Sequence, residues 1–152
     1  MHRKEGRGMP KVHKSIEIKA PVNKVYSFIE YPRNGPEVIT NLLEVTDVTG
    51  TGVDTHYKWT WNMAGMKFKG ENTRVEDVPN KRIVMNSKGG IESTWTYNFE
   101  SKGDVTVLDL DIDYKIPVPI LGKVAEKLLR SRNEREMNTN LMNLKEKLEE
   151  KA

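Results

Sequence analysis

The stretch PILGKVAEKLLRSRNEREMNTNLMNLKEKLEEK, residues 119–151, decides the fold. After Pro119 it contains no further proline, and its only glycine is Gly122, in the first turn. Apolar residues recur three and four positions apart, which predicts an amphipathic helix; they are Leu121, Val124, Leu128, Met137, Leu141, Leu144 and Leu148. At roughly 1.5 Å of rise per residue, such a helix would be ~45 Å long and would cross a whole small domain.

The apolar stripe of this helix has a polar gap in its middle. Between Leu128 and Met137 the core-facing positions are occupied by Ser131, Glu134 and Arg135. Two interpretations fit a helix that is buried at both ends and polar between them. The middle either overhangs solvent or lines a partly polar cavity, and the helix alone leaves both open.

Upstream of the helix, most of the chain shows the two-residue alternation typical of strands. A first strand is predicted at 11–19, followed by a helix from Val22 to Tyr31 and a second short helix at 37–39. Further strands are predicted at 42–49, 53–62, 67–77, 82–87, 91–100 and 106–114. Because tight turns join neighbouring antiparallel strands, we expect an α+β fold with a curved seven-stranded antiparallel sheet around the terminal helix.

Length and composition favour one domain, residues 11–152, preceded by a disordered basic tail, residues 1–10. The chain has 152 residues, 36% of them hydrophobic and 31% charged. The first 14 residues hold five Lys or Arg and one acid, so the remaining 138 carry −1 of the total charge of +3. Since the basic excess lies in the tail and not on a folded face, no nucleic-acid partner is predicted.

The absence of cysteine excludes disulfides and thiolate metal ligands and is compatible with a cytoplasmic protein. No apolar run approaches the ~18 residues of a membrane span, and the first residues lack the apolar core of a signal peptide. The sequence therefore predicts a cytoplasmic protein without an integral membrane segment. Transient contact with a membrane surface remains compatible with it, and no oligomeric state is predicted.

Several stretches in order resemble the START-like (SRPBCC) helix-grip superfamily, specifically its polyketide cyclase/dehydrase and lipid-transport branch. The opening Ile18-Lys-Ala-Pro-Val-Asn-Lys-Val-Tyr-Ser-Phe-Ile29 is similar to the family's first strand and helix. So are the Val78–Ile83 turn, the strand Thr94–Phe99, and Tyr114-Lys-Ile-Pro-Val-Pro-Ile-Leu-Gly122 before the last helix. The resemblance covers about residues 12–148. It implies a cavity for a hydrophobic small molecule between the sheet and the long helix.

The inward phases of the strands bring aromatic and apolar side chains to this space. Such residues either fill a core or form a pocket with apolar walls and a few polar handles. The polar gap in the helix favours the pocket, with Asn72 or Arg74 available to orient a ligand oxygen. We therefore predict these ligand-binding residues: Tyr57, Trp59, Trp61, Phe68, Asn72, Met85, Trp95, Tyr97, Leu110, Leu128, Ser131 and Arg135.

No metal site or catalytic residue is predicted. Asp109, Asp111 and Asp113 alternate with apolar residues, as on the outer face of a strand, and lack the glycine of a calcium loop. His13 and His56 fall on the polar phases of their strands, and nothing in the spacing selects an acid–base pair. We predict no cofactor.

The leading hypothesis is a binding or carrier protein for a lipid-, quinone- or polyketide-like molecule. One alternative is an enzyme of the polyketide cyclase/dehydratase type. Another is an accessory subunit that docks on a larger complex. The residues alone favour a non-enzyme without excluding the other two.

Deleting residues 1–10 should leave the melting temperature within about 2 °C, because the tail has no apolar periodicity with which to join the core. Thermal unfolding followed by circular dichroism measures this. A loss of several degrees would contradict the assignment of the tail.

Overall fold

The computed structural model describes residues 11–63, 65–89, 92–115 and 122–150, with side chains 122–126, 128 and 129 excepted. The predicted tail, the hairpin residue Ala64, the strand start Ile91, the segment before the last helix, and the side chains of Val124 and Leu128 lie outside the described residues.

Seven antiparallel strands form one curved sheet, which confirms the predicted helix-grip architecture. They are β1 (Lys11–Ile18), β2 (Leu42–Thr49), β3 (His56–Met63), β4 (Met66–Val78), β5 (Arg82–Gly89), β6 (Ser93–Lys102) and β7 (Val105–Tyr114). The order is β1-β7-β6-β5-β4-β3-β2, so only β1 is displaced from its place in the sequence, beside β7. The short hairpins predicted from the sequence account for the rest of this order.

One part of the strand prediction is wrong. Residues Gly52–Asp54 form the 3-10 helix η2, and β3 begins only at His56. Gly52 has φ of 57°, in the left-handed region outside the range of strands, and the amide of Asp54 donates to the carbonyl of Thr51. The alternation before His56 is therefore that of a turn.

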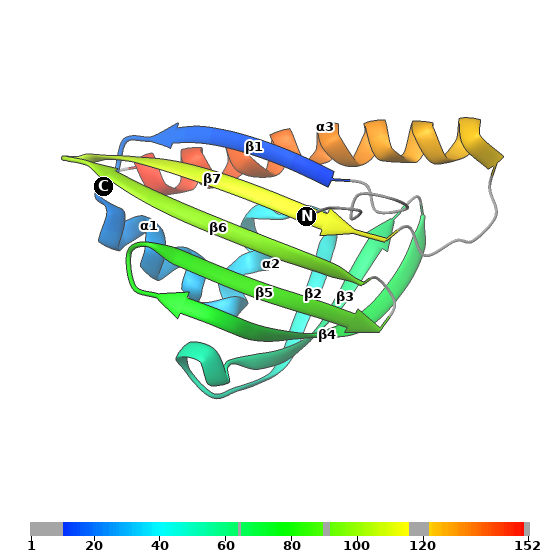
Figure 1. Ribbon diagram of the computed structural model, residues 1–152, viewed down its shortest axis with the longest axis horizontal. Coiled ribbons are helices and arrows are strands. Elements are labelled where there is room, and N and C mark those ends of the chain that lie inside the picture. The colour runs from blue at the N-terminus through cyan, green and yellow to red at the C-terminus, as the bar shows by residue number, and fades with distance from the viewer. Residues whose placement is uncertain (1–10, 64, 90–91, 116–121, 151–152) are drawn as a thin grey trace, which may run out of the picture.

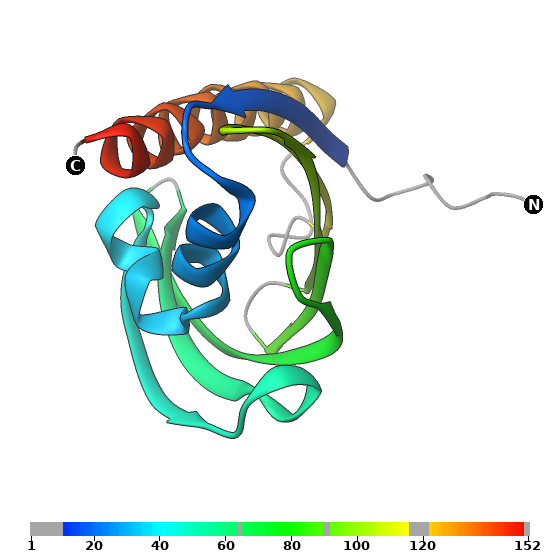
Figure 2. The ribbon, with the colours of Figure 1, turned by 90° about the vertical axis from the view of Figure 1, so that its left-hand side faces the viewer.

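Three helical segments lie inside the curve of the sheet, as Figure 2 shows, and α3 runs along β1 (Figure 1). They are α1 (Val22–Glu30), η1 (Pro32–Asn34) and α2 (Gly35–Val38), so the second short helix begins earlier than predicted. Helix α3 spans Gly122–Glu149. None of these helices is long and apolar enough to cross a membrane, as far as the chain is described.

Helix α3 is fixed to the domain by both apolar and polar contacts. Met137, Leu141, Leu144 and Leu148 are buried, as their spacing predicted. Near its end, the Nζ of Lys145 donates to the carbonyl of β1 residue Glu17 at 2.9 Å. These contacts hold the helix as one wall of the interior.

A buried ion pair within β4 holds α1 through hydrogen bonds to that helix. Arg74 and Asp77, both almost wholly buried, lie 3.2 Å apart, and Arg74 also donates to the carbonyl of Glu30 at 3.0 Å. The hydroxyl of Tyr26 in α1 donates to the carboxylate of Asp77. The sequence had allowed Arg74 to orient a ligand oxygen. In the structure both terminal nitrogens of Arg74 are bonded to Asp77 and Glu30 instead.

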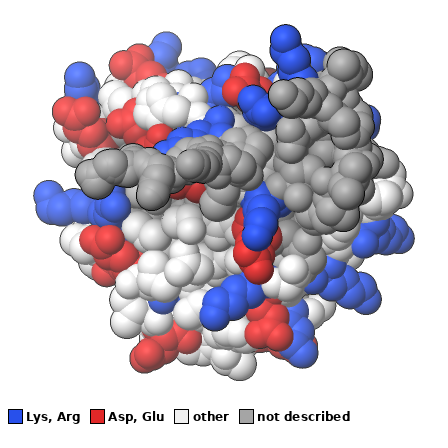
Figure 3. Space-filling view, turned by 45° about the vertical axis from the view of Figure 1, so that its right-hand side comes forward, with Lys and Arg blue, Asp and Glu red and all other residues white. Residues whose placement is uncertain are grey.

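On the outer face of the sheet, opposite charges alternate. His13 lies 2.5 Å from Asp111, and Lys11 lies 3.7 Å from Asp113, so the predicted aspartate row of β7 pairs with β1. The surface in Figure 3 likewise mixes Lys and Arg with Asp and Glu. Among the described residues, no three His, Asp or Glu side chains come together as metal ligands.

Replacing Leu141 by alanine should lower the free energy of unfolding by about 2–5 kcal/mol, because a buried side chain is truncated. Its neighbour Met142 is exposed, so Met142→Ala should change stability by less than ~0.5 kcal/mol. Urea unfolding followed by circular dichroism measures both. Equal losses in the two variants would contradict the position of α3.

Candidate functional site

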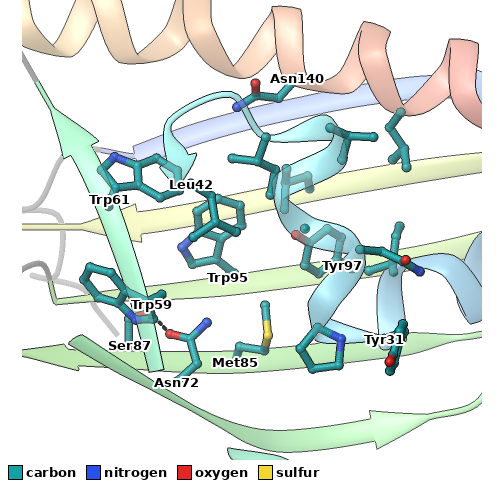
Figure 4. A pocket seen from close by; sticks show the side chains of 18 of the residues that line it. Tyr31, Leu42, Trp59, Trp61, Asn72, Met85, Ser87, Trp95, Tyr97 and Asn140 are labelled. Atoms are coloured by element: carbon teal, nitrogen blue, oxygen red, sulfur yellow. Dashed lines mark hydrogen bonds between the residues drawn. The ribbon is translucent and has the colours of Figure 1, made fainter. Parts of the chain in front are cut away.

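A cavity of about 110 Å³ lies between the inner face of the sheet, the α1–α2 segment and α3 (Figure 4). The strands contribute most of its aromatic and polar lining: Tyr57, Trp59, Trp61, Asn72, Met85, Ser87, Ser93, Trp95, Tyr97 and Leu110. The α1–α2 segment and the loop after it contribute Phe28, Ile29, Tyr31, Pro32, Asn34, Gly35, Val38 and Ile39, the start of β2 contributes Leu42, and α3 contributes Met137, Asn140, Leu141 and Leu144. None of these side chains carries a formal charge at neutral pH.

An aromatic cluster forms one wall of the cavity. The rings of Trp61 and Trp95 meet edge to face, with centroids 6.1 Å apart, and Trp95 stacks on Tyr97 at 6.3 Å. Alternate residues of one strand share a face, which explains why Trp95 and Tyr97 are neighbours. The Nε1 of Trp95 donates to the hydroxyl of Ser93 at 3.1 Å, which fixes the orientation of the indole.

Trp59 depends on a glycine of the neighbouring strand. Gly70 lies opposite Trp59 in the register of β3 and β4, and a Cβ atom at Gly70 would fall 2.3 Å from the indole. Only glycine therefore permits the indole to lie against β4. The Nε1 of Trp59 is buried and makes no hydrogen bond to any described residue.

A hydrogen-bonded group of three polar side chains lies at the β3–β5 side of the cavity. The amide of Asn72 donates to the hydroxyl of Tyr57 at 2.7 Å, and Ser87 donates to the amide oxygen of Asn72. The hydroxyl of Tyr57 donates in turn to the sulfur of Met85 at 3.3 Å. Burial raises the pKa of Tyr57, so this phenol stays neutral at physiological pH.

The hydroxyl of Tyr97 makes no hydrogen bond to any described residue, although the side chain is buried. Burial raises its pKa, and the nearby Tyr57 adds to the rise. The group is thus a neutral donor rather than a phenolate. Figure 4 shows it directed toward the interior of the cavity.

From the opposite wall, Asn140 of α3 contributes a second free donor. Its Oδ1 accepts from the amide of Thr40 at 3.1 Å and from the hydroxyl of Thr40 at 3.3 Å. Its buried Nδ2 makes no hydrogen bond to a described residue. Thr40 therefore fixes the side-chain amide of Asn140, with Oδ1 occupied and Nδ2 available.

Most of the residues predicted from the strands do lie together in the cavity lining: Tyr57, Trp59, Trp61, Asn72, Met85, Trp95, Tyr97 and Leu110. Phe68 is partly buried against the core and does not line the cavity. The side chain of Leu128 lies outside the described residues. Whether any of these residues binds a ligand stays a prediction.

The predicted placement of Ser131 and Arg135 is wrong. Both are exposed on α3, and Arg135 donates to the hydroxyl of Ser131 at 3.2 Å. The buried stripe continues backward from Met137 to Asn133, four residues earlier, and includes Asn140. Counting forward from Leu128 gave the wrong phase across the polar gap.

Sequence reasoning missed the α1–α2 segment, Ser87, Ser93 and Asn140. Ser93 shares the inward phase of Trp95 and Tyr97, and Asn140 lies three residues after Met137, so helical and strand spacing could have found both. Phe28 and Ile29 lie in the apolar spacing of α1, which could also have found them. The segments η1 and α2 had no such signal, because three and four residues are too few to define a face.

The comparisons with known proteins agree with this geometry. Residues 9–149 match the family described as polyketide cyclase / dehydrase and lipid transport. The chain belongs to this family. No curated protein matches the chain in sequence.

Three solved structures illustrate the shared helix-grip fold. A Thermus thermophilus protein is 22% identical with a TM-score of 0.80, covering 91% of this chain and 97% of its own. The Zhui aromatase/cyclase from a Streptomyces species is 14% identical with a TM-score of 0.79, covering 93% of this chain and 94% of its own. A START superfamily protein from Mycobacterium smegmatis is 16% identical with a TM-score of 0.74, covering 91% of this chain and 99% of its own.

Replacing Tyr57 by phenylalanine should lower the free energy of unfolding by about 1–3 kcal/mol, because the buried amide of Asn72 loses its acceptor. The same change at the half-exposed Tyr31 is the control and should cost less than ~0.5 kcal/mol. Denaturant unfolding of both variants measures the difference. A neutral Tyr57→Phe would show that the buried polar group does not depend on this hydroxyl.

Proposed function

We propose that the protein binds a neutral, largely apolar ring compound that carries a hydrogen-bond acceptor. It would do so as a binding or carrier protein. The observation that carries this proposal is a cavity whose described lining is aromatic and uncharged, with the buried phenol of Tyr97, which makes no hydrogen bond to a described residue.

The lining favours a neutral ligand over an ionised one. Moving an ion from water into an apolar space without a counter-charge is strongly unfavourable. The buried cation of β4, Arg74, does not line the cavity and is already paired with Asp77. The cavity therefore offers an acidic ligand no partner, and the hydrogen bond from Tyr97 suits a carbonyl or ether oxygen.

The cavity volume limits the size of the ligand. Drug-sized ligands occupy pockets of roughly 300–1,000 Å³, whereas an engineered apolar cavity of about 150 Å³ holds benzene. At about 110 Å³, this cavity suits a single ring with a small substituent. Lipid- or polyketide-sized ligands would require the α1–α2 segment or α3 to move.

An enzyme of the aromatase/cyclase type is the second candidate, because the family description and the similar fold of the Zhui protein both point to this chemistry. General acid–base catalysis needs a group whose pKa lies near the working pH. In the cavity lining the titratable groups are tyrosines, and burial moves the pKa of Tyr57 and Tyr97 upward, away from that range. This observation supports binding over turnover. Docking as an accessory subunit stays a prediction.

Three probes of similar shape test the proposal: acetophenone, isopropylbenzene and benzoate. Acetophenone should bind saturably with a stoichiometry of one. After correction for partition into octanol, it should bind about tenfold more tightly than isopropylbenzene, because it gains one hydrogen bond. Benzoate should not bind. Isothermal titration calorimetry measures all three.

The test variant is Tyr97→Phe and the control is Met142→Ala, at an exposed position of α3 outside both cavities. The first should remove the preference for acetophenone and leave binding of isopropylbenzene, whereas the second should leave both. Tight binding of benzoate, or no saturable binding of any probe, would overturn the proposal. Release of a cyclised or dehydrated product from a linear polyketone would favour the enzyme.

A further inference from the structure

A second cavity of about 50 Å³ lies beside the first, deeper along α3 toward Tyr114, and we call it the annex. Its lining contains one charged side chain, Glu136, which the lining of the first cavity lacks. The residues that line it are Val12, Asn41, Trp61, Met63, Ser93, Trp95, Ile112, Tyr114, Asn133, Glu136, Met137 and Asn140. Between Leu128 and Met137, the helix residues that line this cavity are Asn133 and Glu136, and not the predicted Ser131, Glu134 and Arg135.

The annex and the first cavity share a wall. Trp61, Ser93, Trp95, Met137 and Asn140 line both spaces. The edge-to-face pair of Trp61 and Trp95 forms the aromatic part of this wall, and Figure 4 shows Asn140 on the α3 side of the two indoles. A ligand ring in the first cavity would thus rest against the wall beyond which the annex begins.

Polar groups with unused hydrogen-bonding capacity gather around the annex. The Nδ2 of Asn140, whose side chain is 97% buried, has no partner among the described residues. The hydroxyl of Tyr114 accepts from Asn133 at 2.9 Å, and the hydroxyl of Ser93 accepts from Trp95 at 3.1 Å, so each retains its own proton to donate.

The one charged side chain of the annex lining is already paired. Glu136 accepts from the guanidinium of Arg132 at 3.2 Å, on the outer side of α3. Asn140, Tyr114 and Ser93 thus supply donors, in a space large enough for one small polar substituent. A carboxylate would meet Glu136 as a like charge, which disfavours an anionic group there.

From these observations we propose that the annex is a polar subsite for the ligand of the first cavity. It would receive a neutral acceptor group, such as a ketone carbonyl, held on a short flexible tether and bonded by Asn140. The inference rests on the proposed function, because it takes the ring to lie in the first cavity. It narrows the ligand class to a single ring with a carbonyl two or three bonds away.

Two methionines report separately on the two spaces. Met85 lines the first cavity and not the annex, whereas Met63 lines the annex and not the first cavity. In protein labelled with 13C at the methionine methyl groups, toluene should shift the Met85 resonance and leave the Met63 resonance unmoved. The ketone 4-phenylbutan-2-one, which adds a tethered carbonyl to the ring, should shift both resonances. Met142, exposed on α3, is the internal control.

Affinity tests the hydrogen bond itself. Butylbenzene has the same chain length as 4-phenylbutan-2-one but lacks the carbonyl. After correction for partition into octanol, the ketone should bind about tenfold more tightly. Asn140→Asp keeps the oxygen that accepts from Thr40 and removes the Nδ2 donor, so it should abolish this preference. Asn138→Asp, the same change at an exposed position of α3, should preserve it.

The outcomes separate the two proposals. If toluene does not bind, the proposed function fails and this inference fails with it. If toluene shifts Met85 but the ketone leaves Met63 unmoved, the annex is not a subsite, although the proposed function stands. A ketone preference that survives Asn140→Asp would likewise overturn the role of Asn140.

Discussion

Burial of the concave face of the sheet is the constraint on which the rest of the structure depends. A seven-stranded antiparallel sheet twists and curls, and its inner side chains must leave water. One helix cannot fill the whole curve, so the α1–α2 segment enters from the open side and closes it (Figure 2). Hydrogen bonds from Arg74 to Glu30 and from Tyr26 to Asp77 hold α1 in that position. A cavity remains where the two coverings meet.

The alternation of residues predicts the strand side of this cavity well, for a physical reason. A strand's period of two leaves no freedom once one face is known to be buried, so Tyr57, Trp59, Trp95 and Tyr97 could only point together. Turn chemistry limited the prediction at Gly52, whose positive φ ends the pattern before β3 begins. The helix side was harder, because helical phase has to be carried across residues that give no apolar signal. Arg135 was misplaced for this reason.

Some buried donors of the cavity lower the stability of the fold, and the same donors are available to a ligand. Leaving a buried donor without a partner costs about 1–3 kcal/mol, and most proteins avoid it. Here Trp59 and Asn140 each carry such a donor at the cavity wall. By contrast, Asn72 beside them is satisfied through Tyr57 and Ser87. The satisfied group fixes the shape of the wall, and the unsatisfied ones mark where a ligand atom would gain most.

The proposed chemistry follows from where charge is absent as much as from where donors lie. The described charged side chains of α3 do not line the first cavity, and Glu136, which lines the annex, is paired with Arg132. A donor-rich, uncharged interior discriminates against ions by desolvation and against hydrocarbons by its unused hydrogen bonds. In the proposed complex, the ring of the ligand would lie on one side of Trp61 and Trp95, and its polar end would lie on the other side. In this family the fold provides the cavity, and these few side chains would decide which molecule enters it.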